Sequence, residues 1–172
     1  FTLGHGEEPF WKNTQKLIQV DIDPSIIYDG PLAVLVNRFS ASASEIFAAA
    51  IQDYGRGIIV GEQTYGKGTV QNLIDLNQVS RNSTNKFGQL KLTIAKYYRI
   101  NGGSTQRLGV IPDITFPSYT DPQEFGESSQ ISALPWYKIN PANYKLVRCL
   151  CFFRIFKAVN LVNGFLFSII TL

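Results

Sequence analysis

The clearest pattern in the sequence is an unbroken apolar run at residues 31–36 (PLAVLV), which ends in a β-branched residue. Such a run is typical of a short strand buried on both faces. Further along, apolar side chains recur at positions 46, 47, 50, 51 and 54, which is the spacing of an amphipathic helix. Gly55 then marks the helix end, and residues 57–61 (GIIVG) predict a second short buried strand.

Two later segments, residues 69–74 and 89–100, alternate apolar and polar side chains, as half-exposed strands do. The order strand, helix, strand, followed by two alternating strands, predicts an α/β fold with an added antiparallel ribbon. Residues 117–144 are mostly polar and carry four prolines, which indicates an exposed connection. Residues 146–172 then become abruptly apolar.

The composition supports a folded protein, because 45% of the 172 residues are hydrophobic and 17% are charged. Residues 1–144 hold 12 Lys and Arg against 13 Asp and Glu, whereas residues 145–172 hold four basic residues and no acid. The net charge of +3 therefore comes from the tail and gives no indication of nucleic-acid binding. The basic, apolar tail gives a further interpretation, association with a membrane surface or aggregation, which we favour over a membrane-spanning segment. Its longest uncharged stretch, residues 158–172, is shorter than the roughly 20 residues of a spanning helix.

The ends of the chain carry little chemistry of their own. The chain begins at Phe1 without the pattern of a signal peptide, so we interpret it as an internal piece of a longer protein. Its two cysteines, Cys149 and Cys151, lack a second pair for zinc and are poorly spaced for an internal disulfide. We expect these thiols to be chemically idle, and we expect neither a metal site nor a cofactor.

The first candidate for chemistry is Ser42, which lies between the first predicted strand and the predicted helix. A serine at a helix start has free backbone N–H groups and the positive end of the helix dipole beside it, which stabilise an oxyanion. Ser42 and Glu45 also have the spacing of a capping box. The sequence therefore leaves two roles open, a nucleophile and a helix cap.

A nucleophilic serine needs a base, and the single histidine, His5, lies in a glycine-rich start far from Ser42. A lysine amine acts as a base where burial lowers its pKa. Lys67, between Gly66 and Gly68, is the candidate, and in a strand Gln71 would project to its side and hold the amine. The alternative role of Lys67 is a solvated surface charge.

A competing motif overlaps this lysine. Residues 61–67 (GEQTYGK) fit the opening of a phosphate-binding loop and follow a predicted strand. The next residue is Gly68, where that motif needs Ser or Thr for magnesium, and the residues after it have strand character. Nucleotide binding through Gly61–Lys67 is therefore a lesser alternative.

Three blocks of the sequence together resemble the tail-specific proteases, also called carboxy-terminal processing peptidases. Residues 30–50 (GPLAVLVNRFSASASEIFAAA) are similar to their nucleophile segment, and residues 65–71 (YGKGTVQ) to their lysine segment. Residues 98–114 (YRINGGSTQRLGVIPDI) are similar to the block that follows, and residues 133–136 (ALPW) to a stretch of the long bacterial members. The resemblance covers about residues 26–144.

This resemblance implies a serine endopeptidase with a Ser–Lys dyad on a crotonase-like α/β core. Ser42 aligns with the nucleophile, Lys67 with the general base and Gln71 with the residue that assists the lysine. Asp53 aligns with an acidic residue of the family, to which we assign a supporting role, and the backbone N–H of Ala43 is the nearby oxyanion donor. The family's substrates are unfolded or C-terminally tagged proteins, usually in the bacterial periplasm or at the inner membrane.

The chain also departs from the family pattern. Residues 1–25 do not supply the glycine-rich segment that contributes to the family's oxyanion hole, and the upstream PDZ domain is absent from this chain. We therefore expect a poorly matched segment at residues 1–25, a partial catalytic core at 26–116 and a Pro-rich connection at 117–145. Residues 146–172 form a tail unlike the family. One interpretation is a fragment of an active protease, and the alternative is an inactive remnant that acts at most as a folding or association module.

Overall fold

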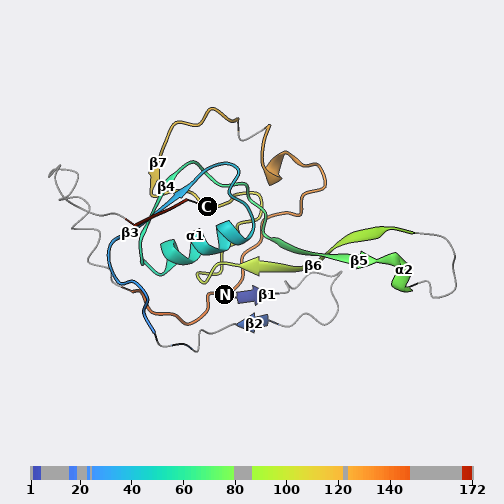
Figure 1. Cartoon of the computed structure of the whole chain (residues 1–172), viewed down its shortest axis with the longest axis horizontal. Helices are drawn as coiled ribbons and strands as arrows, with labels where there is room; N and C mark the ends of the chain where they lie inside the picture. The colour runs from blue at the N-terminus through green and yellow to red at the C-terminus, as the bar shows by residue number, and fades with distance from the viewer. Residues whose placement is uncertain are drawn as a thin grey trace.

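The computed structural model describes residues 2–4, 16–18, 23, 25–79, 87–121, 124–147 and 168–171. Within these residues the strands form two four-stranded sheets (Figure 1). The elements in chain order are β1 (Thr2–Gly4), β2 (Lys16–Ile18), β3 (Leu32–Val36), α1 (Ala43–Asp53), β4 (Ile58–Gly61), β5 (Thr69–Asp75), α2 (Leu76–Val79), β6 (Gln89–Tyr98), β7 (Ile114–Thr115), a 3₁₀ turn (Glu127–Ser129) and β8 (Ser168–Thr171).

The first sheet is parallel and has the strand order β7-β4-β3-β8. The strands β3 and β4 pair side by side, with Val34 opposite Ile59, and α1 connects them as a β-α-β crossover. This confirms the α/β class predicted from the sequence. The helix follows the predicted apolar spacing, and Gly55, with a φ of 66°, lies just beyond its C-cap residue Tyr54.

The hydrophobic core lies where α1 packs on the parallel sheet. Its buried members are Leu32, Val34, Val36, Ala48, Ala49, Ile59 and Val110. The prediction that the strand at residues 31–36 is buried on both faces is wrong, because Ala33 and Leu35 are only half-buried. The physical reason is that α1 covers only the face of β3 that carries Leu32, Val34 and Val36.

The second sheet is antiparallel and has the order β2-β1-β6-β5. In it β1 pairs with the end of β6 (Lys96–Tyr98), so residues 2–4 share a sheet with the predicted core. The β5–β6 ribbon reaches away from the rest of the described chain, with α2 at its far end (Figure 1). Leu90, Leu92 and Ile94 are each more than 40% exposed there, because among the described residues only β5 pairs with this half of β6.

The Pro-rich segment expected at residues 117–145 has little regular structure, and it is tied to the core by hydrogen bonds. The indole N–H of Trp136 donates to the carbonyl of Ser104 at 2.8 Å. The backbone N–H of Ile139 donates to the carbonyl of Gly102 at 2.9 Å. The segment therefore runs over the surface of the core as a covering strap.

Part of the tail has a defined place in the fold. Residues 168–171 form β8, which pairs in parallel with β3 at its open side, with Val34 opposite Ile170. Residues 148–167, which include both cysteines, lie outside the described residues. In the part of the chain that the structure describes, no helix is long and apolar enough to cross a membrane.

Candidate active site

Ser42 occupies the sharp connection between β3 and α1. Its backbone has a φ of 55° and a ψ of −108°, outside the three regions that side-chain-bearing residues normally adopt. Among the described non-glycine residues, only Ser42 and Arg107 have a positive φ. Such a conformation costs of order 1–3 kcal/mol and persists only where surrounding contacts enforce it. Strain of this kind collects at functional sites, which makes Ser42 a candidate on geometry as well as on sequence.

Ser42 is also the N-cap residue of α1, as the capping-box spacing predicts. The carboxylate of Glu45 accepts a hydrogen bond from the backbone N–H of Ser42 at 2.8 Å. Ala43 is the first residue of the helix, so its backbone N–H lies at the positive end of the helix dipole. Capping and nucleophilic attack are therefore compatible roles for one residue.

Lys67 lies in the loop between β4 and β5, where two glycines allow the chain to approach residues 106 and 107 closely. Gly66 has a φ of 97°, and a Cβ on it would lie 2.9 Å from the backbone of Arg107. A Cβ on Gly68 would lie 2.7 Å from the backbone nitrogen of Gln106. The loop therefore holds Lys67 in a half-buried position against the segment that follows β6.

Glu45 joins the two candidate residues through their backbones. One carboxylate oxygen accepts from the N–H of Ser42 at 2.8 Å and from the N–H of Lys67 at 2.9 Å. The other oxygen accepts from the Thr64 hydroxyl at 2.6 Å and from the Gly66 N–H at 2.7 Å. Glu45 is fully buried, and this burial raises the pKa of its carboxyl group although the four hydrogen bonds act to lower it.

Tyr97, near the end of β6, contacts the same two residues from the other side. Its hydroxyl oxygen lies within hydrogen-bond distance of the carbonyl oxygen of Lys67 and, at 3.2 Å, of that of Ser42, so the two carbonyls share its single proton. Only 3% of Tyr97 is exposed, and burial, with the nearby charge of Glu45, raises the pKa of its hydroxyl. The hydroxyl therefore stays protonated and remains a donor.

The structure thus brings the Ser42 and Lys67 backbones together, and two side chains that the sequence analysis did not assign to the site make the connection. Glu45 gave a local signal, the capping box, which pointed only to the helix start. Tyr97 gave none, because an alternating strand does not indicate which side chain meets a distant loop. Among the described residues, no hydrogen bond joins the Lys67 amine to the Ser42 hydroxyl.

Gln71 lies on β5 with an exposed side chain. Its amide nitrogen lies 3.4 Å from the hydroxyl oxygen of Thr93 on the paired strand β6. A contact of Gln71 with the Lys67 amine therefore stays a prediction.

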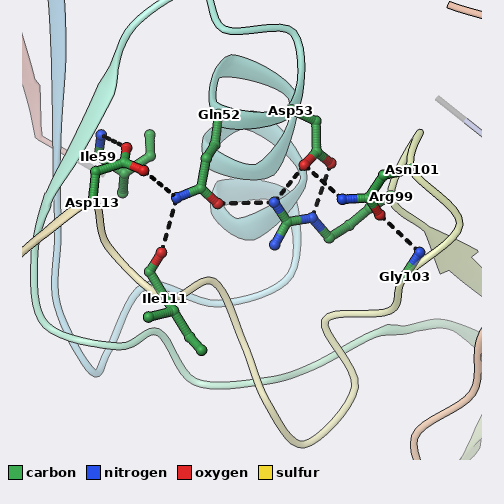
Figure 2. Close-up of polar contacts among 8 residues, drawn as sticks. All are labelled: Gln52, Asp53, Ile59, Arg99, Asn101, Gly103, Ile111 and Asp113. Carbon is green, nitrogen blue, oxygen red and sulfur yellow. Dashed lines mark hydrogen bonds and ion pairs between the residues drawn. The ribbon is translucent and has the colours of Figure 1, made fainter.

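Asp53 lies at the other end of α1 from Ser42, in a polar network (Figure 2). Its carboxylate accepts from Arg99 through two nitrogens, at 2.9 and 2.6 Å, and from the amide of Asn101 at 2.8 Å. Beside it, Gln52 accepts from Arg99 and donates to the carboxylate of Asp113 at 2.9 Å. These contacts attach the helix end to the segment after β6 and to residues 111–113.

The structure contradicts the phosphate-loop alternative at Gly61–Lys67. The element after Lys67 is the strand β5, whereas a phosphate-binding loop opens a helix whose N-terminus holds the phosphate. The N–H groups of Gly66 and Lys67, which would cradle an anion, already donate to the buried carboxylate of Glu45. The carboxyl group of Glu45 therefore occupies the place that a phosphate would need.

Other candidate chemistry is sparse in the described part of the chain. No group of three or more His, Cys, Asp or Glu side chains lies close enough there to hold a metal ion. His5 lies outside the described residues.

The chain is similar in sequence to known peptidases. A sequence model of the family described as peptidase family S41 matches residues 6–116, beginning inside the segment 1–25 that the sequence analysis set apart. The tail-specific protease of Haemophilus influenzae is 49% identical over 146 residues, which cover 85% of this chain and 21% of that protein. The carboxy-terminal-processing protease of Bartonella bacilliformis is 48% identical over 84 residues, 49% of this chain and 18% of that protein.

Among solved structures, a photosystem II D1 C-terminal processing protease is similar at 35% identity and a TM-score of 0.43. The matched region covers 65% of this chain and 25% of that one. The chain spans about a fifth of the length of the curated relatives that it matches.

Proposed function

The chain belongs to peptidase family S41, and on that premise we propose that it carries the Ser–Lys dyad of a serine endopeptidase. Ser42 is the nucleophile and Lys67 the general base. The observation that carries the proposal is the strained backbone of Ser42, which Glu45 ties to the Lys67 loop. A strained serine at a strand-to-helix turn presents its hydroxyl at the helix start, where developing negative charge is stabilised.

The proposed reaction proceeds in two halves. The neutral amine of Lys67 takes the proton of the Ser42 hydroxyl as its oxygen attacks the peptide carbonyl. The backbone N–H of Ala43 donates to the oxyanion. The protonated lysine then gives its proton to the leaving amine, and the acyl-enzyme forms. In the second half Lys67 takes a proton from water, the hydroxide attacks the ester, and the proton returns to Ser42.

We assign Asp53 and Gln71 to supporting roles. The ion pair of Asp53 with Arg99 supports a structural role at the end of α1, far along the helix from the reacting hydroxyl. Assistance of Lys67 by Gln71 requires the amide to turn from Thr93 towards the amine.

The substrates that we propose are unfolded or C-terminally tagged polypeptides. The names of the relatives support this class, because they describe tail-specific or carboxy-terminal-processing proteases. We further propose a crotonase-like core, a PDZ domain upstream of these residues in the parent protein, and a periplasmic or inner-membrane-associated location. Association of the tail at residues 146–172 with a membrane surface stays part of this proposal.

The test is cleavage of an unfolded reporter polypeptide with an apolar C-terminus by the intact protein that carries these residues. Ser42→Ala and Lys67→Ala are each expected to lower kcat/KM by more than about a thousandfold. Ser44→Ala is the matched control, since it removes a neighbouring hydroxyl on α1, and it should stay within a few-fold of the parent protein. Near-parental turnover by Lys67→Ala would exclude the dyad. No cleavage by the parent protein would favour the alternative, an inactive folding or association module.

A further inference from the structure

Tyr97 lies where the antiparallel sheet meets the candidate site. The backbone N–H of Tyr97 donates to the carbonyl of Gly68 at 3.1 Å, which brings the end of β6 against the Lys67 loop. The side chain then reaches the carbonyls of Ser42 and Lys67 with a single hydroxyl group. Ser42 follows β3 of the parallel sheet, and Lys67 lies between β4 of that sheet and β5 of the antiparallel sheet. Tyr97 on β6 therefore contacts the chain where the two sheets meet.

The contacts of Tyr97 complement those of Glu45. Glu45 accepts from the backbone N–H of Ser42 and of Lys67, whereas Tyr97 shares its one hydroxyl proton between the two backbone carbonyls. Two side chains therefore hold both polar backbone groups of both residues. A residue whose N–H and carbonyl are both fixed has little freedom in φ and ψ. Ser42 needs this restraint most, because its φ of 55° is unfavourable for a serine.

Resting on the function proposed above, we propose that Tyr97 is a positioning residue of the dyad, whose hydroxyl sets the separation of the Ser42 and Lys67 backbones. It touches neither the substrate nor the reacting atoms, and it acts through the two carbonyls. Catalysis is sensitive to such positioning, since a misplacement of about 1 Å costs about a hundredfold in rate. Removing the hydroxyl takes the Tyr97 contact from both carbonyls. The Ser42 carbonyl keeps the hydrogen bond that it accepts from the backbone N–H of Ile46 at 3.0 Å, so the Lys67 loop is the part that is released.

The experiment compares Tyr97→Phe with Tyr98→Phe in the intact protein. Each variant removes one hydroxyl from a tyrosine that is 3% exposed, in adjacent positions at the end of β6. Two readouts are used: steady-state cleavage of the unfolded reporter, and labelling of Ser42 by a small fluorophosphonate. In the labelling the serine oxygen bonds to phosphorus, fluoride leaves, and Lys67 takes the serine proton.

Tyr97→Phe is expected to lower kcat and the labelling rate by about 10- to 100-fold, with KM unchanged. Tyr98→Phe should change each of these values by about twofold or less. The rate constant of labelling separates positioning from a general loss of folded protein, because unfolded protein lowers the final extent of labelling and not its rate constant. Circular dichroism of both variants checks the folded state.

Equal labelling rates and equal kcat values in the two variants would overturn the positioning role and leave the proposed function intact. If the parent protein itself neither labels at Ser42 nor cleaves, the proposed function fails, and the inference fails with it. The two failures are distinguishable because only the first occurs with an active parent protein.

Discussion

At the scale of single residues, the site depends on a carboxylate that has been taken out of water. Glu45 is fully buried, and its two oxygens accept four hydrogen bonds from the strand-to-helix turn and the lysine loop. The neighbouring Arg38, which is also buried, donates to the carbonyls of Thr64 and Phe125 at 2.8 Å. Because four donors point at the side-chain end of residue 45, a side chain that accepts hydrogen bonds fits this position and one that donates them does not.

Glu45→Gln is therefore expected to destabilise the protein although it removes a buried charge. The amide nitrogen of glutamine would face backbone N–H groups that now donate to the carboxylate. We expect the free energy of unfolding to fall by about 2–4 kcal/mol, measured by urea denaturation. Glu124→Gln, at an exposed position, is the matched control and should change it by less than about 0.5 kcal/mol. A Glu45→Gln variant as stable as this control would show that the four contacts contribute little.

The pH dependence of stability gives a second test of Glu45. Because burial raises the pKa of this carboxyl above its ordinary value of 4.5, the folded state binds the proton more tightly than the unfolded state. The contribution of Glu45 to stability is therefore present at low pH and is lost as pH rises from 4.5 through the raised pKa. The difference in unfolding free energy between parent and Glu45→Gln should shrink over that range, and a difference that grows instead would contradict the raised pKa.

The sequence predicted the residue positions of the site better than their contacts. The local patterns of strand, serine, helix and glycine-flanked lysine indicated Ser42 and Lys67 as candidates, and the resemblance to the tail-specific proteases assigned their roles, which stay predictions. The contacts of Tyr97 with both residues join segments that lie far apart in the sequence, and no local pattern encodes them. The phosphate-loop motif at residues 61–67 is a local pattern that misleads for the same reason. Only the fold shows that the carboxyl group of Glu45 accepts from the N–H groups of this loop.

At the scale of elements, polar contacts hold α1 at both of its ends. Glu45 fixes its first turn to the lysine loop, and the Asp53–Arg99 pair fixes its last turn to the segment after β6 (Figure 2). The side chain of Asp53 is 5% exposed and that of Arg99 is 16% exposed. A buried pair of this kind is costly to break from one side, because the remaining charge stays without its partner.

Asp53→Ala is expected to lower the free energy of unfolding by about 3 kcal/mol, measured by thermal or urea denaturation. Asp29→Ala, which removes an exposed carboxylate, is the matched control and should leave stability nearly unchanged. If Asp53→Ala kept parental stability and lost Ser42 labelling, Asp53 would belong to the reaction and not to the support of the helix.

The central elements were predictable, whereas the short elements β1, β2, α2, β7 and β8 were not predicted. The helix at Ala43–Asp53 follows from the apolar spacing and from Gly55, and β4, β5 and β6 follow from their short-range patterns. The sequence did not predict which strands pair. For example, β1 (Thr2–Gly4) pairs with the end of β6 (Lys96–Tyr98), which lies far from it in the sequence. The half-buried state of Ala33 and Leu35 was missed for the same reason, since the cover on the second face of a strand comes from distant residues.

At the scale of the whole molecule, two sheets of different type meet at the candidate site. Ser42 follows β3 of the parallel sheet, Lys67 lies on the connection from β4 of that sheet to β5 of the antiparallel sheet, and β6 of the antiparallel sheet supplies Tyr97. The outer side of β3 in the parallel sheet is paired by β8. Without that strand, β3 would become an open edge that is able to pair with another chain.

Deleting residues 168–172 is therefore expected to promote self-association. Light scattering and analytical ultracentrifugation of the shortened chain should show oligomers at concentrations where the parent chain is monodisperse. Removing Leu172 alone is the matched control, because it leaves β8 (Ser168–Thr171) complete. Equal behaviour of the two shortened chains would mean that β8 does not protect the edge of β3.

The pairing of β3 with β8 also has a consequence for folding during synthesis, because the two strands are made at different times. The unit β3–α1–β4 is complete once residue 61 has been made, whereas the strand that covers its open side is made more than 100 residues later. At 5 to 20 residues per second, a ribosome takes roughly 5 to 20 seconds to add that stretch. During this interval the nascent chain carries an uncovered parallel edge, and neighbouring ribosomes on one message hold identical edges close by. Newly made chains are thus most exposed to mispairing at β3 before β8 has been made, and slower translation lengthens the exposure.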